Sequence, residues 1–504
     1  MTASPTSRRQ AHIAPPSPVV IGLLLAVAAI AVGTTIAGTG LTVIGALFAA
    51  GLIVLQRPDA ATLVVLFAIY SNAAVVAVRF HNVPGLLAIA LPLALLAPLA
   101  HHVLLRRQPI ILTPTLPWLM GFFLAQVIAT AAATDPRGAL EHLANVAVEG
   151  IGLFVLIVNV VRTPGLLRAS CWALLVAGAF LGALSAYQEL TGTYGNAYWG
   201  FAQVKDAAGG FFTGVETLTG RVRQPELAGP IGDQNFYAQI MLMLIPIGLA
   251  RTMAERMPYS LIALGCTMLV AAGTILTFSR GAAVAGLVLG VTMILLRFVS
   301  MRHVLVVALA FVVLAVAVPE YVGRIATLDV ISSIFSGQGG IDGADVSLQS
   351  RATENLAAGL VFVDHPLTGV GPGQFPSYYQ EYANRVGLEV QLADRQAHTL
   401  YLGIAAESGI VGLVSFLGIL GTAVIGILRL RGPLARIDRG LAITVTGLGL
   451  AVVAFMLTGL FLHLAYARYA WLVVALASAG LVIGRDIVAN HARRGEASSI
   501  SSAR

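Results

Sequence analysis

The sequence predicts an all-α polytopic membrane protein with about 12–14 transmembrane helices and a large extracytoplasmic loop. Of its 504 residues, 58% are hydrophobic and only 11% are charged, whereas soluble domains carry about 25% charged residues. Apolar runs close to the roughly 20 residues that a bilayer core requires recur along the chain. Arginines gather between these runs in a regular way. A soluble domain is excluded on these grounds.

Fourteen apolar runs have the length of a transmembrane helix. They are 18–37, 40–56, 60–78, 84–104, 114–133, 143–161, 168–187, 231–250, 258–278, 281–297, 303–319, 409–428, 440–461 and 469–485.

The distribution of basic residues orients these spans, because cytoplasmic loops collect Lys and Arg. With the N-terminus inside, 19 of the 30 basic residues fall in cytoplasmic segments, and most acids fall outside. Arg8 and Arg9 precede the first run without a convincing cleavage site, so we expect an uncleaved first span with both termini cytoplasmic. The predicted segments are a tail (1–17), helices (18–187), an external loop (188–229), helices (230–319), a large external loop (320–397), helices (398–486) and a tail (487–504).

Several kinds of site have no sequence signature here. Cys171 and Cys266 both lie in apolar runs and do not form a disulfide framework. Zinc-ligand spacing, a Walker loop and a paired-carboxylate motif are absent from the sequence, and no charged run suits nucleic acid. We therefore predict neither a metal site nor a nucleic-acid partner.

The first candidate site residue is Arg280, in the stretch ILTFSRGAAV. It can be interpreted as an interfacial arginine that extends to lipid headgroups. However, its neighbours are small and apolar, and arginine is disfavoured on the external face. We favour a role in anion binding.

Arg221 and Arg223 precede a span that opens with Pro230, Asp233 and Asn235. Helix capping accounts for Pro230 and Asp233, and leaves Asn235 uncertain between structure and function. Capping does not account for two arginines at the outer surface. One of them is a candidate phosphate ligand, and the sequence does not choose between them.

His398 lies where the large loop returns to helix, in RQAHTLYLGIAAESGI. A lone histidine at a membrane interface is most often a bystander, so its spacing alone assigns no role. Glu407 follows on the same helix near the start of an apolar span. A carboxylate there requires a partner, for which arginine is the obvious candidate, and structural pairing is slightly preferred over function.

The large loop contains an amphipathic helical pattern at 350–363, followed by DHPLTGVGPGQF. Gly369, Gly371 and Gly373 predict a tight turn and are a weak signal for a phosphate cradle. His365 precedes a proline and suits a turn better than a base. The aromatic rings of Tyr378 and Tyr379 could stack on sugars or anchor at the interface. 

Three blocks in this order resemble the O-antigen ligase and O-antigen polymerase superfamily of bacterial inner-membrane glycan transferases. They are LTFSRGA, HPLTGVGPGQF and AHTLYLGIAAESGIVGL, and RQPELAGPIGDQN is similar to the family's arginine-containing segment before a helical hairpin. The resemblance covers about residues 215–430. Thr399 departs from the Asn or Ser that many members have after the histidine.

The resemblance implies a membrane-embedded C-type glycosyltransferase architecture and an inverting, metal-independent transfer that needs no cofactor. The donor would be a glycan on polyprenyl pyrophosphate, and the acceptor an envelope glycan, glycolipid or glycoprotein. Arg280 and one of Arg221 and Arg223 would hold the pyrophosphate, and His398 would take the acceptor proton. Arg351 and Arg395 of the large loop are further candidate substrate ligands.

Other functions stay open at this point. A polymerase shares this chemistry and differs only in its acceptor. A transporter or lipid-linked oligosaccharide flippase would need charged groups through the membrane depth, whereas the arginines and His398 cluster externally. A scaffold would leave those arginines unexplained. We therefore favour an extracytoplasmic transferase in the bacterial cytoplasmic membrane.

Overall fold

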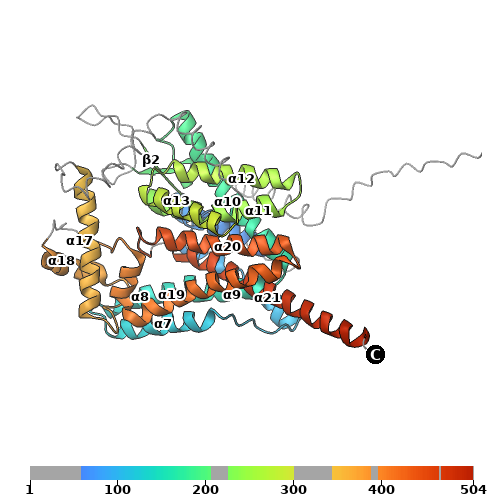
Figure 1. The fold of residues 1–504 in the computed structure, drawn as a ribbon. Coiled ribbons are helices and arrows are strands. Elements are labelled where there is room, and N and C mark those ends of the chain that lie inside the picture. The colour runs from blue at the N-terminus through green and yellow to red at the C-terminus, as the bar shows by residue number, and fades with distance from the viewer. Residues whose placement is uncertain (1–57, 206–224, 300–342, 388–394, 465–466, 503–504) are drawn as a thin grey trace, which may run out of the picture.

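The computed structural model describes residues 58–205, 225–299, 343–387, 395–464 and 467–502. Within them the chain is almost entirely helical, with one two-stranded sheet (Figure 1). The predicted spans at 18–37, 40–56 and 303–319 lie outside the described residues, as do Arg221 and Arg223.

The first described helices form a broken span. Helix α3 (Pro58–Tyr70) and helix α4 (Ala73–His81) are bent by 58°, with Asn72 at the break in the left-handed conformation (φ 61°). Asparagine tolerates this conformation better than most residues. Its Nδ2 donates to Pro230 O (2.8 Å), and its Oδ1 accepts from Arg468 (2.7 Å). Hydrogen bonds to distant residues thus satisfy the side chain of Asn72 at a break in the predicted span 60–78. The predicted single span at 84–104 is wrong in its continuity. It is divided into α5 (Gly85–Leu93), α6 (Leu96–Ala100) and η1 (His101–Leu105), with Pro92 near the break.

The next helices have clear start and stop signals. Helix α7 (Leu116–Ala131) is followed by α8 (Pro136–Asn145), which runs through η2 (Val146–Gly152) into α9 (Leu153–Val160). Helix α10 (Pro164–Thr191) begins with Thr163, whose side chain accepts from Leu166 N, and ends at Gly192 with φ 66°. This N-cap, first-position proline and left-handed glycine make α10 longer than its apolar core at 168–187.

A small sheet leads into the central helices. A short η3 (Tyr198–Gly200) precedes strand β1 (Gln203–Lys205), which pairs antiparallel with β2 (Glu226–Gly229). Helices α11 (Gln234–Ala254), α12 (Tyr259–Ile275) and α13 (Arg280–Leu295) follow. Asp233 accepts hydrogen bonds from the backbone N–H groups of Asn235 and Phe236, which confirms the predicted cap.

Two helices of the large loop lie across one end of the bundle. Helix α17 (Gly343–Asp364) stands across the axes of α19 and α20, with α18 (Phe375–Val386) beside it (Figure 1). A separate hydrophobic cluster holds these two helices together, and it includes Val361, Phe375 and Tyr379. We call α17 and α18 the cap, and the end of the bundle that they cover the cap end.

Three long helices complete the chain: α19 (Leu400–Ala435), α20 (Arg439–Thr458) and α21 (Ala467–Ser502). Six of the described helices are long and apolar enough to cross a membrane, or seven if the bent α3–α4 pair is one span. Four shorter apolar helices accompany them. This is the predicted all-α polytopic membrane protein, while the total of 12–14 spans stays a prediction.

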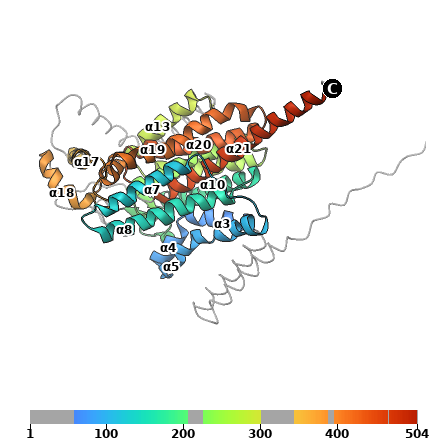
Figure 2. The ribbon, with the colours of Figure 1, turned by 90° about the horizontal axis from the view of Figure 1, so that it is seen from below.

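Arginines mark the opposite end of the bundle, from which α21 projects in both views (Figures 1 and 2). We call it the tail end, and its arginines include Arg106, Arg162, Arg168, Arg251, Arg429, Arg431, Arg436 and Arg439. Arg251 is fully buried there and contacts Glu255 and Thr444. The tail end matches the face that the arginine distribution predicts to be cytoplasmic.

Candidate active site

His398 lies against a buried carboxylate at the cap end. Its Nδ1 is 2.6 Å from Oε2 of Glu354, which belongs to α17 and is 1% exposed. No other described residue bonds to either atom. A buried carboxylate is costly unless it is paired, so Glu354 and the imidazole stabilise each other. The sequence does not reveal this pair, because 43 intervening residues separate its members and only the docking of α17 brings them together.

Glu354 gathers two further groups around His398. Ser350, one helical turn earlier on α17, donates its hydroxyl to Oε1 (3.1 Å). The Nε atom of Arg395 lies 4.0 Å from the same oxygen. The carboxylate is therefore fixed from both sides, and its second oxygen is left to face His398. Arg395, predicted as a substrate ligand, reaches the site through Glu354.

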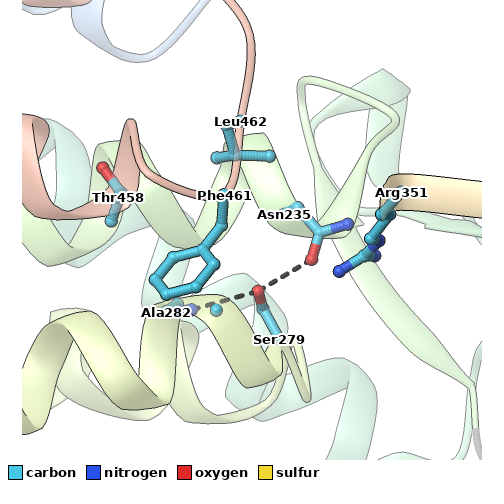
Figure 3. Close-up of a pocket in the computed structure, with 8 residues that line it drawn as sticks. Asn235, Ser279, Ala282, Arg351, Thr458, Phe461 and Leu462 are labelled. Atoms are coloured by element: carbon cyan, nitrogen blue, oxygen red, sulfur yellow. Dashed lines mark hydrogen bonds between the residues drawn. The ribbon is translucent and has the colours of Figure 1, made fainter. Parts of the chain in front are cut away.

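A small pocket at the cap end collects the start of α13, the start of α11 and Arg351 (Figure 3). Ser279 donates its hydroxyl to Asn235 Oδ1 (2.7 Å) and caps α13 by accepting from Ala282 N. Figure 3 shows the Arg351 side chain beside Asn235. The remaining lining comes from the end of α20 and the segment after it: Thr458, Phe461 and Leu462.

The charge around this pocket favours an anion at its mouth, since the pocket itself, at about 10 Å³, has room for no more than a water molecule. The first N–H groups of a helix have no acceptor within it, and they add positive potential at the start of α13. Arg351 supplies a full charge and makes no ion pair with any described residue. Asn235, uncertain from sequence, is fixed by Ser279 and lines the pocket.

Arg280 is the first residue of α13 and is exposed at the cap end. It makes no ion pair with any described residue. The following Gly281 packs closely against Phe461, since a Cβ there would lie 3.1 Å from the Phe461 Cβ. The small residue after Arg280 thus lets α13 start beside the pocket.

His463 is a second histidine near the pair, and sequence reasoning missed it. Its ring packs edge-on against Phe236, with centroids 5.0 Å apart. Burial lowers the pKa of His463 to about 4, and the charges of His398, Asp233 and Glu354 act on it as well. His463 is therefore neutral at pH 7. A histidine that interrupts the apolar LFLHLAY segment was the only signal in the sequence.

The glycine turn is not a phosphate cradle, because its N–H groups are already used. Gly369 N donates to His365 O, Val370 N to Ala406 O, and Gly371 N to Glu407 O. Gln374 N donates to Gly371 O. The glycines, with φ of 68°, 109° and 70°, instead allow the turn to lie directly against α19.

Glu407 completes this attachment. Its carboxylate accepts the backbone N–H groups of Gly373 and Phe375. The prediction that an arginine pairs with Glu407 is wrong among the described residues, where two backbone N–H groups are its partners instead. The preference for a structural role fits this geometry. Gly409 follows with φ 62° and ψ −168° inside α19, and Ile410 N donates to Pro366 O.

The two tyrosines of α18 differ in environment. Tyr379 is 0% exposed and packs beside Phe375, so it offers no ring face to a sugar. The prediction that Tyr379 stacks on a glycan is wrong for that reason. Tyr378 is half-buried, with its hydroxyl bonded to Thr134, and its ring lies 6.1 Å from that of His365. His365 directly follows α17, which agrees with the predicted turn.

A known protein family matches the part of the chain that contains most of this site. Residues 265–417 match the family model described as O-antigen ligase. The matched segment contains Arg280, Arg351, Glu354 and His398, so both members of the histidine–carboxylate pair lie within it. No curated protein gives a significant match to the chain.

Asn235 and His463 lie outside the matched O-antigen ligase segment. They come from α11 and from the segment between α20 and α21. Leu400 N donates to Gly459 O (2.8 Å), which joins the start of α19, next to His398, to the end of α20. The site is thus built from the matched segment and the helices around it.

Proposed function

We propose that this O-antigen ligase-like protein transfers a glycan from a polyprenyl-pyrophosphate donor to a hydroxyl of an envelope acceptor at the cap end. The observation that carries the proposal is the 2.6 Å contact between His398 and the buried Glu354. Arg351, three residues before Glu354 on α17, lines the adjacent pocket. A base and an anion site thus come from one helix and its partners.

His398 would act as the general base. With Nδ1 facing the carboxylate, the Nδ1–H tautomer is favoured, and Nε2 carries the lone pair. Nε2 takes the proton of the acceptor hydroxyl as the oxygen attacks the anomeric carbon. Glu354 stabilises the imidazolium that forms.

The leaving group is the polyprenyl pyrophosphate. The bond from the acceptor oxygen to the anomeric carbon forms while the bond from that carbon to the phosphate oxygen breaks. The electron pair leaves with the pyrophosphate, and one displacement inverts the anomeric centre. Arg280 and Arg351 would stabilise the developing charge with donors that stay charged at physiological pH. Arg221 or Arg223 is proposed to share this task, and no metal or cofactor is required in this scheme.

The proposed orientation places the cap end outside the cytoplasm and both termini inside. It is supported by the arginines at the tail end, which the positive-inside rule assigns to the cytoplasm. The proposed location is the bacterial cytoplasmic membrane, where a lipid-linked donor meets an envelope acceptor.

The test uses purified protein in lipid with a polyprenyl-pyrophosphate-linked oligosaccharide and candidate acceptors, in EDTA. Release of polyprenyl pyrophosphate is followed for wild type, Arg280→Ala and His398→Ala. We expect His398→Ala to lower turnover by about 10²–10⁴, and Arg280→Ala to lower it strongly. A product ladder would identify a polymerase rather than a ligase. Donor that is never consumed, or variants equal to wild type, would refute the transferase and favour a transporter.

A further inference from the structure

A second pocket lies at the tail end, away from the histidine–carboxylate pair. It is a cavity of about 480 Å³ between the start of α3, η1, the end of α9 and the start of α10. This is within the size range of small-molecule sites, about 300–1,000 Å³. We call it the tail-end pocket. The glycan transfer proposed above makes no use of it.

Two arginines give the tail-end pocket its charge. The Arg162 guanidinium donates to Asn159 O (2.6 Å), Pro109 O (2.9 Å) and Asn159 Oδ1 (3.2 Å), all of them neutral oxygens. These bonds fix the orientation of the guanidinium without neutralising it. Arg106 Nε donates to His101 Nε2 (3.1 Å). The pocket's carboxylate, Asp59, is exposed and makes no ion pair with a described residue.

A buried histidine in the wall is missing a partner. His102 is 7% exposed, and its Nδ1 lies 3.0 Å from Gln108 Oε1, an acceptor. Nδ1 therefore carries hydrogen, and Nε2 has no partner among the described residues. A buried polar atom without a partner costs about 1–3 kcal/mol. In the neutral imidazole Nε2 is then an acceptor, so it can accept a hydrogen bond from a hydroxyl of a bound headgroup.

The surroundings of the pocket are apolar. Leu63, Val160 and Leu166 contribute to its walls, and Leu104 and Leu105, which precede Arg106, are 72% and 75% exposed. Fixed guanidinium groups suit phosphate oxygens. Apolar surface next to them suits acyl chains. Basic pockets between transmembrane helices on the cytoplasmic side are typical sites for anionic lipid headgroups.

We propose that the tail-end pocket binds a phosphate group, carried by an anionic phospholipid whose headgroup contacts Arg106, Arg162 and His102. Arg162 is already oriented by its neutral acceptors, so little further side-chain entropy is lost when a lipid binds. The shared chemistry is the phosphate, and the experiment separates the lipid from a free phosphate.

The experiment is native mass spectrometry of the full chain in detergent with added phosphatidylglycerol or phosphatidylcholine. Wild type should retain phosphatidylglycerol in preference to phosphatidylcholine. Arg106→Gln should weaken retention about fivefold, the effect of about one interfacial arginine. Arg162→Lys keeps the positive charge but loses the planar guanidinium with its paired donors, and it should weaken retention of phosphatidylglycerol as well. The control Arg429→Gln/Arg436→Gln removes two exposed charges at the same end and should retain the lipid.

Arg106→Gln tests the pocket without disturbing the bonds of Arg162 to Pro109 and Asn159, so folding is preserved. Competition with glycerol phosphate or inorganic phosphate identifies the source. Displacement at concentrations close to that of the lipid assigns the site to a free phosphate rather than a headgroup. Equal retention of the two lipids, or loss in the Arg429/Arg436 control equal to that in Arg106→Gln, overturns the proposal.

Discussion

Replacing Glu354 with glutamine tests the histidine–carboxylate pair most directly. Glutamine keeps the size of the side chain and an acceptor for Ser350, but removes the charge 2.6 Å from His398 Nδ1. Hydrogen bonds to charged groups contribute about 1.5–3 kcal/mol. In the proposed mechanism the imidazolium forms as the acceptor hydroxyl loses its proton, so this loss should appear in the barrier, and kcat should fall about 10–150-fold. KM should change little. Release of polyprenyl pyrophosphate gives both constants.

A double-mutant cycle separates this role from a structural one. In the His398→Ala background, Glu354→Gln should cost nothing more, because the group that it stabilises is absent. Ser350→Ala is the matched control, since it removes a contact to the same carboxylate and leaves the charge. Its effect should be far smaller. Equal losses from Glu354→Gln in both backgrounds would refute the reasoning, and so would an unchanged kcat in the single variant.

Three further predictions concern other parts of the site. Gly409→Ala should destabilise the fold by about 3 kcal/mol or more, because a Cβ would lie 2.3 Å from Leu367 O at a φ of 62°. As a control, Gly421→Ala on the same helix, where the nearest atom is 4.0 Å away, should leave the thermal unfolding midpoint in detergent nearly unchanged. Equal midpoints for the two variants would contradict this prediction. Burial holds the pKa of His463 near 4 in the folded state, below the value of about 6.5 expected for a histidine in the unfolded chain. Between these two pH values the unfolded chain binds more protons, so the free energy of unfolding should rise from pH 4.5 to 7 by up to about 3 kcal/mol. The variant His463→Phe should flatten that rise. Arg280→Lys should keep donor binding partly intact but lower kcat about 10–100-fold, because an ammonium group cannot make the two parallel hydrogen bonds that a guanidinium makes to a phosphate. A kcat equal to that of wild type would argue against contact between Arg280 and the phosphate.

The local signals in the sequence were sufficient for much of the fold. The apolar run at 168–187 located α10, whose ends Thr163 and Gly192 set through capping chemistry that depends on neighbouring residues alone. Asp233 caps α11 for the same reason. Hydrophobic runs predicted the helices because a span must be apolar along its length. The break at Asn72 was not predictable in this way, since its partners Pro230 and Arg468 are distant in sequence.

The site was predictable only in part. His398 and Arg351 were predicted as individual residues, but no sequence pattern joins His398 to Glu354. Glu354 lies within the predicted amphipathic helix, where an acid is usually interpreted as solvated, yet it is buried. The glycine turn shows the opposite error. Three glycines can expose N–H groups to a phosphate or press a turn against a helix, and only the hydrogen-bond partners distinguish the two.

The contacts that seat the cap also assemble the proposed base. Glu354 belongs to α17 and His398 precedes α19, so the pair exists only while α17 lies across the start of α19. That position is set by the glycine turn between α17 and α18, which is bonded to Ala406 and Glu407 of α19. If the proposed mechanism holds, Glu407, whose carboxylate accepts from the turn, influences catalysis without touching substrate. Substitutions at Glu407 should lower kcat through the alignment of Glu354 with His398, and their effect should vanish in the His398→Ala background.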